Sequence, residues 1–270
     1  MNLFKRLRTT GRASAALFGL LIAVSFSSAP ALAAGDAKPP KDHDWSWESG
    51  PGGFTGTYDK GSLQRGFKVY KEVCASCHGL KLVAFRNLAD PGGPGFSEAE
   101  VKAISKEYTK EVLDEVGDPV EVPRAPFDYF PSPFANEAQA RASNNGAYPP
   151  DLSVINKARA GGANYIYSLL IGYKDAPAGF DLGDGMYYNE YFKNKQIAMA
   201  PPLSEDIVEY DDGTPASLEQ LAEDVTTFLM WTAEPKLEER KRMGFMVIIY
   251  LIIMAALLFF TYRKIWADRH

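Results

Sequence analysis

The sequence predicts a mostly α-helical chain that ends in one membrane-spanning helix. Apolar residues recur at helical spacing in two stretches, Leu63 to Val73 and Leu218 to Leu229, and a Ser-Leu-Glu-Gln capping box at 217–220 opens the second. A third stretch, Met243 to Tyr262, has twenty residues without a charge. As a helix it is about 30 Å long, the thickness of the hydrocarbon core of a bilayer. Too few residues follow to bury it in a core, so we predict a transmembrane helix.

The first 33 residues are typical of a secretory signal peptide. A basic start precedes an apolar run from Ala15 to Val24, and Ala31-Leu32-Ala33 matches a small-residue cleavage site. We expect cleavage after Ala33, with Ala34 as the alternative. An exported N-terminus and a single span predict a bacterial inner-membrane protein with a periplasmic domain at 34–235. The anchor would cover 236–262, and 263–270 would form a cytoplasmic tail with Tyr262 and Trp266 near the interface.

The charge of the exported part restricts its partners. Without the signal peptide and the tail, the chain carries 22 basic and 33 acidic residues, a net charge of about −11. Such a charge excludes a nucleic-acid partner, because binding to phosphates needs basic residues. It favours a basic protein partner.

The most specific motif is Cys74-Ala75-Ser76-Cys77-His78, the spacing of c-type haem attachment. A structural zinc site needs four ligands, and the whole chain has two cysteines and three histidines. A thioredoxin-like motif would follow a strand, whereas helical periodicity precedes Cys74. We therefore predict one haem c, bound covalently by Cys74 and Cys77, with His78 as an axial iron ligand.

The segments around this motif predict further helices and loops. Residues 35–61 read as an extended arm packed by aromatic side chains, and Ser62 as the N-cap of the first helix. Ser97 to Val116 reads as a solvated helix within an insertion at 90–133, and Arg124 to Phe134 as a loop over the haem edge. We expect the first helix to pack against the helix that follows Ser217 and ends near Glu234.

The segment at 137–152 predicts a turn-rich loop that carries Arg141 and ends at a helix N-cap, Asp151. Beside a haem, Arg141 can neutralise a propionate, although a surface arginine with no such role is the commoner case. Ala163 to Ile171 reads as a buried helix and Asp181 to Phe192 as a loop.

The second axial position decides whether a haem iron transfers electrons or binds a substrate. A second histidine ligand is nearly excluded by the small number of histidines. Two methionines remain outside the signal peptide, the helix that follows Ser217 and the membrane segment. Met199 lies between small residues and two prolines, which stiffen the backbone, and we favour it over Met186, which lies in a glycine-containing loop. A lone methionine can also be an ordinary core residue.

Four motifs together resemble the cytochrome c1 family, the haem subunits of the cytochrome bc1 complex. They are RGFKVYKEVCASCH at 65–78, NNGAYPPDLS at 144–153, GMYYNEYF at 185–192 and AMAPPL at 198–203, followed by the single C-terminal span. The resemblance implies a class I cytochrome c-like domain with loop insertions, with Cys74, Cys77, His78, Met199 and Arg141 at the haem.

The resemblance also implies the partners. The chain would be a subunit of ubiquinol:cytochrome c oxidoreductase beside cytochrome b and the Rieske iron-sulfur protein, passing electrons to a soluble c-type cytochrome. Some bacterial relatives carry a disulfide near the methionine, which two cysteines cannot supply here, so packing alone is expected to steady Met199. An acidic run follows this residue, and three of its members are candidates for docking: Glu205, Asp206 and Glu209.

Two other functions stay open at this point. A haem sensor or peroxidase-like protein would need an open sixth position on the iron. A membrane-anchored cytochrome that feeds a terminal oxidase would have the same ligands but different partners.

Overall fold

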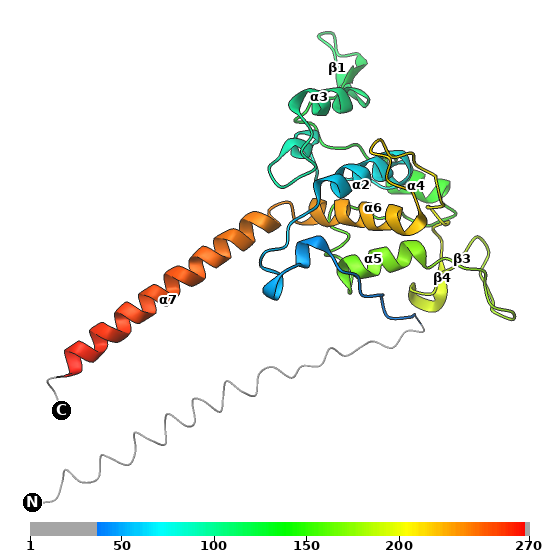
Figure 1. The fold of residues 1–270 in the computed structure, drawn as a ribbon. Coiled ribbons are helices and arrows are strands. Elements are labelled where there is room, and N and C mark those ends of the chain that lie inside the picture. Colours follow the sequence, from blue (N-terminus) through cyan, green and yellow to red (C-terminus); the bar gives the residue numbers. More distant parts are fainter. Residues whose placement is uncertain (1–36, 268–270) are drawn as a thin grey trace, which may run out of the picture. The chain divides into compact units, whose positions relative to one another are not determined.

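The computed structural model describes residues 37–267, so the predicted signal peptide lies outside the described residues. This part is mostly helical, with two short antiparallel strand pairs, as Figure 1 shows, which confirms the predicted fold class. The α-helices are α2 (Lys60–Glu72), α3 (Glu98–Lys106), α4 (Glu137–Ser143), α5 (Gly162–Ile171), α6 (Leu218–Ala233) and α7 (Leu237–Ala267). The strands are β1 (Thr109–Leu113), β2 (Pro119–Pro123), β3 (Tyr187–Tyr188) and β4 (Gln196–Ile197). Short 3-10 turns cover Ser46–Glu48, Pro51–Gly53, Cys74–Ser76, Phe85–Ala89 and Lys193–Lys195.

Helices α2 and α6 lie side by side and form the centre of the domain, as predicted (Figure 1). The rings of Phe67 and Tyr70 on α2 lie 5.7 and 5.9 Å from the ring of Phe228 on α6. The two backbones approach closely at Gly66, where an added Cβ would lie 2.0 Å from the carbonyl oxygen of Asp224. Only glycine fits at this crossing, because any side chain would overlap the backbone of α6.

The caps of these two helices differ from the sequence-based predictions. Asp59, rather than Ser62, caps α2: its Oδ1 accepts a hydrogen bond from the Ser62 backbone N–H at 2.7 Å. Ser217 caps α6 as predicted and accepts from the Gln220 N–H at 3.3 Å. The reciprocal half of the capping box is missing, because the Gln220 side chain instead donates to Asp224 at 3.1 Å.

A buried ion pair joins α2 to α6. The Arg65 guanidinium donates to both carboxylate oxygens of Asp224, at 2.8 and 3.0 Å, and through its third nitrogen to Asp212 at 2.8 Å. The Asp224 side chain is fully buried. Removing one partner of such a pair costs about 3 to 5 kcal/mol, because a charge is left buried without a counter-charge. Arg65 therefore links α2, α6 and the loop between Met199 and α6.

Aromatic side chains pack the N-terminal arm onto the domain, as predicted. Trp45 and Trp47 are buried and stack with ring centroids 4.6 Å apart. Trp47 also contacts Tyr58 at 5.5 Å, and the edge of Trp45 meets Tyr167 of α5 at 5.9 Å. The arm is therefore part of the hydrophobic core.

The predicted helix at 97–116 is only half correct. Ser97 and Glu100 form a reciprocal capping box, and α3 ends at Lys106. Strand β1 then pairs with β2 in an antiparallel hairpin that includes Val112 opposite Val120. The β-branched residues of this segment favour a strand, and Gly117 supplies the left-handed turn position.

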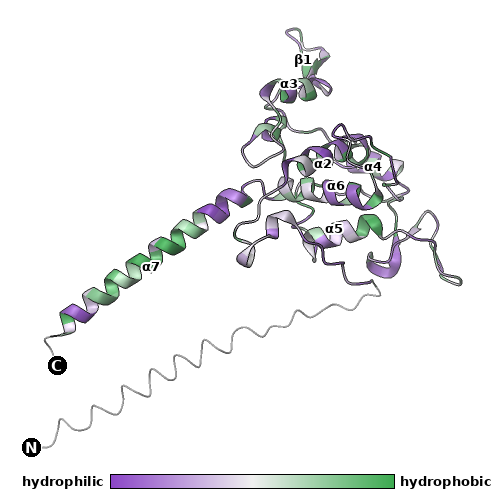
Figure 2. Ribbon diagram, in the orientation of Figure 1, coloured by the Kyte–Doolittle hydropathy of each residue, from purple (hydrophilic) through white to green (hydrophobic). Residues whose placement is uncertain are grey.

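Helix α7 is the one helix in the described part that is long and apolar enough to cross a membrane. Its apolar middle and polar ends are visible in Figure 2. Its side chains beyond Leu237 are not buried in the domain, unlike those of α6. Its first turns contact the N-terminal arm: Glu238 accepts from the Tyr58 N–H at 2.9 Å, and Lys241 donates to the Trp47 carbonyl.

Candidate functional site

The C-terminal end of α2 delivers the two cysteines and the histidine of the Cys-x-x-Cys-His motif. A 3-10 turn at Cys74–Ser76 follows the helix, and the backbone N–H groups of Cys77 and His78 both donate to the Cys74 carbonyl, at 3.1 and 2.9 Å. Both cysteines are free thiols. Burial, with a smaller effect of Cys77, raises the pKa of the Cys74 thiol to about 12. The motif therefore forms a compact turn with two unpaired sulfur atoms.

The ring of His78 is oriented by a backbone carbonyl. Its Nδ1 lies 2.7 Å from the carbonyl oxygen of Pro150, and because a carbonyl only accepts, Nδ1 is the donor. Burial lowers the pKa of His78, which favours the neutral ring. A neutral imidazole whose Nδ1 is held in this way presents Nε2, the arrangement that metal-binding histidines use.

Three hydrogen bonds hold the segment around Pro150 against the segment after His78, and a fourth orients Asp151 within its own segment. The Leu152 N–H donates to the Gly79 carbonyl at 2.9 Å. One Asp151 carboxylate oxygen accepts from the Lys81 N–H at 2.9 Å and the other from the Ser153 N–H at 3.0 Å. Ser153 in turn accepts from the Leu82 N–H at 3.1 Å. Asp151 was predicted as a helix N-cap, but no helix follows it, and its carboxylate instead ties these two turns together.

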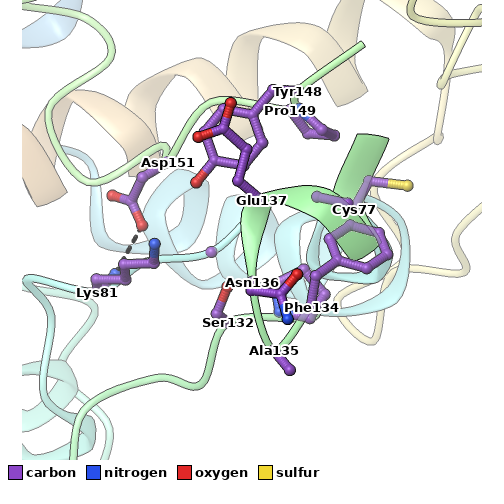
Figure 3. Close-up of a pocket in the computed structure, with 13 residues that line it drawn as sticks. Cys77, Lys81, Ser132, Phe134, Ala135, Asn136, Glu137, Tyr148, Pro149 and Asp151 are labelled. Atoms are coloured by element: carbon purple, nitrogen blue, oxygen red, sulfur yellow. Dashed lines mark hydrogen bonds between the residues drawn. The ribbon is translucent and has the colours of Figure 1, made fainter. Parts of the chain in front are cut away.

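A pocket of about 260 Å³ lies beside the motif. Figure 3 shows Cys77 at one end of its lining and the hydrogen-bonded pair Lys81 and Asp151 at the other. Residues 132–136 also line it, and 132–134 belong to the segment that was predicted as a loop over a haem edge. That segment is irregular, as predicted, and its position over a haem stays a prediction.

The predicted loop at 137–152 begins as a helix. Arg141 lies on α4, which is capped by the Asn136 side chain. Its guanidinium pairs with Glu137, one turn earlier, at 2.7 Å and donates to the Gly146 carbonyl at 2.8 Å. The pair is exposed, and Glu137 and Tyr148, whose ring lies 5.6 Å from the Arg141 guanidinium carbon, both line the pocket beside Cys77.

Neither candidate methionine lines that pocket. Met199 is half-buried and follows β4, and its carbonyl accepts a hydrogen bond from Tyr173 at 3.1 Å. Met186 lines a second pocket, of about 490 Å³, together with Tyr173, Tyr188 and Pro201. The choice between the two sulfur atoms stays a prediction. The expectation that packing alone steadies Met199 is wrong, because the Tyr173 hydrogen bond also holds it.

The acidic run after Met199 extends from Glu205 to Asp224, and its members differ in their partners. Asp211, Asp212 and Asp224 pair with Lys68 and Arg65 of α2, at 2.8 Å in each case. Three other members are exposed and form no ion pair within residues 37–267: Glu205, Asp206 and Glu209.

Comparison with known proteins identifies the family. The model of the cytochrome C1 family matches residues 47–269, which includes the Cys-x-x-Cys-His motif and α7. This chain belongs to the cytochrome c1 family. Cytochrome c1 of Rhodospirillum rubrum is 44% identical over 83% of this chain and 86% of its own length. The mitochondrial cytochrome c1 haem protein of Saccharomyces cerevisiae is 48% identical over 78% of this chain and 68% of its own length.

A third relative is longer than this chain. The cytochrome b/c1 protein of Bradyrhizobium diazoefficiens is 50% identical over 87% of this chain, but the match spans only 36% of its own length.

Cytochrome c1 proteins are haem-containing electron-transfer subunits of the bc1 complex, an oxidoreductase, and the family implies a c-type haem in this chain. Helix α7 agrees with membrane anchoring of such a subunit.

The donor groups at the motif fit a c-type haem. Two free thiols are available for two thioether bonds, and a neutral imidazole presents Nε2 beside them. When bound, the haem supplies a one-electron iron couple, and the chain supplies the ligands and the orientation. Sequence reasoning missed the Pro150 carbonyl, since a main-chain acceptor has no residue signature, and the Tyr173 hydroxyl, which nothing in its local pattern distinguishes.

Proposed function

We propose that this chain takes one electron from the Rieske iron-sulfur protein and passes it to a soluble c-type cytochrome, within a complex that also contains cytochrome b. One haem is bound through Cys74 and Cys77, with His78 and Met199 as axial ligands. The observation that carries the proposal is the His78 ring, held through Nδ1 by the Pro150 carbonyl at 2.7 Å beside two free thiols. This is a ligand ready for a metal rather than a member of a catalytic pair.

Ligation by histidine and methionine suits electron transfer, because it leaves the iron without an open site and methionine raises the reduction potential. Tyr173 supports the choice of Met199, since its hydrogen bond to the Met199 carbonyl holds the backbone of that residue. Among the described residues no side chain donates to the main chain of Met186, whose own N–H donates to the carbonyl of the nearby Gly183.

Arg141 is proposed to face a haem propionate. In the structure it pairs with Glu137 on the domain surface. An exposed helical pair of this kind contributes only about 0.3 to 0.5 kcal/mol, so exchange of Glu137 for a propionate costs little. Arginine can bind such a carboxylate through two parallel hydrogen bonds.

The chain is proposed to be a single-pass protein of a bacterial inner membrane, with residues 34–235 on the periplasmic side and 263–270 in the cytoplasm. The apolar middle of α7 supports one span between Met243 and Tyr262. The signal peptide at 1–33, read from the sequence, supports the orientation.

The ligand assignment is tested with Met199→Leu and its matched control, Met186→Leu, in the full-length holoprotein. We expect Met199→Leu to lower the midpoint potential sharply and to let the reduced haem bind carbon monoxide, while Met186→Leu does neither. Reversed results would assign the ligand to Met186. Binding of carbon monoxide by the unmodified protein would favour a sensor or peroxidase-like function instead.

The partner assignment is tested by purification from membranes in mild detergent. We expect cytochrome b and a Rieske protein to copurify with the chain. Copurification with the subunits of a terminal oxidase would contradict the proposal.

A further inference from the structure

The main chain at Met199 is tied to the C-terminal end of α5. Tyr173 follows Gly172, the residue that ends α5, and its hydroxyl donates to the Met199 carbonyl at 3.1 Å. The Tyr173 side chain is partly buried, and Lys174, the next residue, donates its N–H to the Tyr188 carbonyl at 3.4 Å. The end of α5 therefore contacts the chain both before and at Met199.

Asn189 makes the second connection. Its side chain is fully buried, its Nδ2 donates to the Leu169 carbonyl on α5 at 2.8 Å, and its Oδ1 accepts from the Tyr191 N–H at 3.0 Å. Its own N–H donates to the Lys195 carbonyl at 3.0 Å. Both ends of the amide are thus used, and the residue joins the last turn of α5 to the β3–β4 segment that leads into Met199.

The contact between these segments is too close for any larger residue. A Cβ added at Gly172 would lie 2.5 Å from the Tyr191 ring and 2.9 Å from the Asn189 amide oxygen. The Glu190 N–H donates to the Gly172 carbonyl at 3.1 Å across the same contact. The β3–β4 segment therefore has a defined place against α5 before the chain reaches Met199.

We propose that Tyr173 and Asn189 are positioning residues for Met199, which hold its backbone against α5 so that its sulfur remains the sixth ligand of the iron. This inference rests on the proposed function, in which Met199 is that ligand. Asn189 fixes the segment before the methionine, and Tyr173 fixes the methionine itself. Their hydrogen bonds restrain the segment as a disulfide near the methionine would. The two cysteines of this chain cannot form such a disulfide, because both belong to the haem motif.

The Tyr173 hydroxyl is a reliable donor for this task. The Met199 carbonyl can only accept, so the hydroxyl is the donor in the 3.1 Å contact between them. Removing one neutral hydrogen bond of this kind should increase the fraction of molecules in which Met199 has left the iron by roughly five- to tenfold.

The test compares Tyr173→Phe with Tyr167→Phe in the full-length holoprotein. Tyr167 lies on α5, six residues before Tyr173, and its hydroxyl has no hydrogen-bond partner among the described residues, so Tyr167→Phe controls for the removal of a tyrosine hydroxyl that holds no other segment. Three properties are measured: the sulfur-to-iron absorption band of the oxidised protein, the midpoint potential, and the affinity of the reduced protein for carbon monoxide.

We expect Tyr173→Phe to weaken the sulfur-to-iron band, lower the midpoint potential and raise the carbon monoxide affinity roughly five- to tenfold, with Tyr167→Phe unchanged. Asn189→Ala should move the same three properties further, because two side-chain hydrogen bonds are lost. If all three properties of Tyr173→Phe match those of the unmodified protein while Met199→Leu changes them, the positioning role is refuted and the ligand assignment stands. If Met199→Leu leaves them unchanged, the ligand assignment fails first and the inference falls with it.

Discussion

Replacement of Gly66 by alanine tests the contact on which the site is built. The new Cβ would lie 2.0 Å from the Asp224 carbonyl oxygen and 2.7 Å from the Phe228 Cβ, whereas ordinary contacts begin at 3.4 Å. Both obstacles belong to α6 and neither is a flexible side-chain end, so α2 and α6 must move apart. Overpacking of this kind costs about 1 to 3 kcal/mol, and alanine returns about 1 kcal/mol of helix propensity.

Because the clash involves backbone, we take the upper part of this range and expect a net loss of about 2 kcal/mol. For a domain of this size that corresponds to a fall in Tm of about 4 to 8 °C. The helix that moves carries Cys74 to His78 at its end, so haem content should fall as well. Thermal unfolding of the purified holoprotein, followed by circular dichroism, measures the first effect, and haem absorbance per mole of protein measures the second.

Gly61→Ala is the matched control on the same helix. A Cβ there would meet only the Arg65 guanidinium at 3.2 Å and the Asp59 carboxylate at 3.3 Å, and each side chain would need to move by only a few tenths of an ångström. We expect its Tm to be unchanged or slightly raised. If Gly66→Ala behaves like Gly61→Ala, the close approach of α2 and α6 is not what the distances indicate, and the reasoning is refuted.

Three further predictions follow from the charges and the anchor. Electron transfer to a basic soluble cytochrome should slow as salt is added, because exposed charges are screened beyond a Debye length of about 8 Å. The dependence of the rate on ionic strength should flatten when three carboxylates are neutralised: Glu205, Asp206 and Glu209. An unchanged slope would mean that they form only a solvated face. A backbone hydrogen bond from Thr214 and the Arg65 contact lower the pKa of Asp212 to about 2, below its unfolded value. The contribution of Asp212 to the free energy of unfolding is therefore complete above about pH 4 and is lost as the pH falls toward 2. Asp212→Asn should make the fall of this free energy with pH less steep between pH 4 and 2. An equal slope in the variant and the unmodified protein would contradict the lowered pKa. A chain stopped before Met243 should be recovered from the periplasm without detergent, with a six-coordinate haem, and export without haem would show that α7 is needed for folding.

The features that follow from local chemistry were predictable from the sequence. The apolar stripe that ends in Cys74, the cap at Ser217 and the uncharged span of α7 each depend on a period or a spacing within one segment. Ser62 was mistaken for a cap because Asp59 is an equally good one, three residues earlier, and the choice depends on where the first turn begins. The strand at Thr109 was missed because its stability comes from pairing with residues 119–123.

In the site, too, features set by one segment were predictable and features set by tertiary contacts were not. The proposed ligands have distinctive types and spacings, so His78 could be named as a candidate from the sequence. What orients it, the Pro150 carbonyl, is a main-chain atom 72 positions away and depends on how the two turns dock. Tyr173 reaches the Met199 carbonyl across 26 positions for the same reason. Tertiary contacts of this kind have no local pattern.

The pairing of α2 with α6 also sets an order of events during synthesis. About 140 residues separate Cys77 from the start of α6, and at 5 to 20 residues per second their synthesis takes roughly 7 to 28 s. Until then α2 lacks the helix that covers Phe67 and Tyr70, and Arg65 lacks Asp224. The turn that carries the two thiols therefore leaves the ribosome on an incomplete domain, and α2 gains its main packing partner only when α6 has been made.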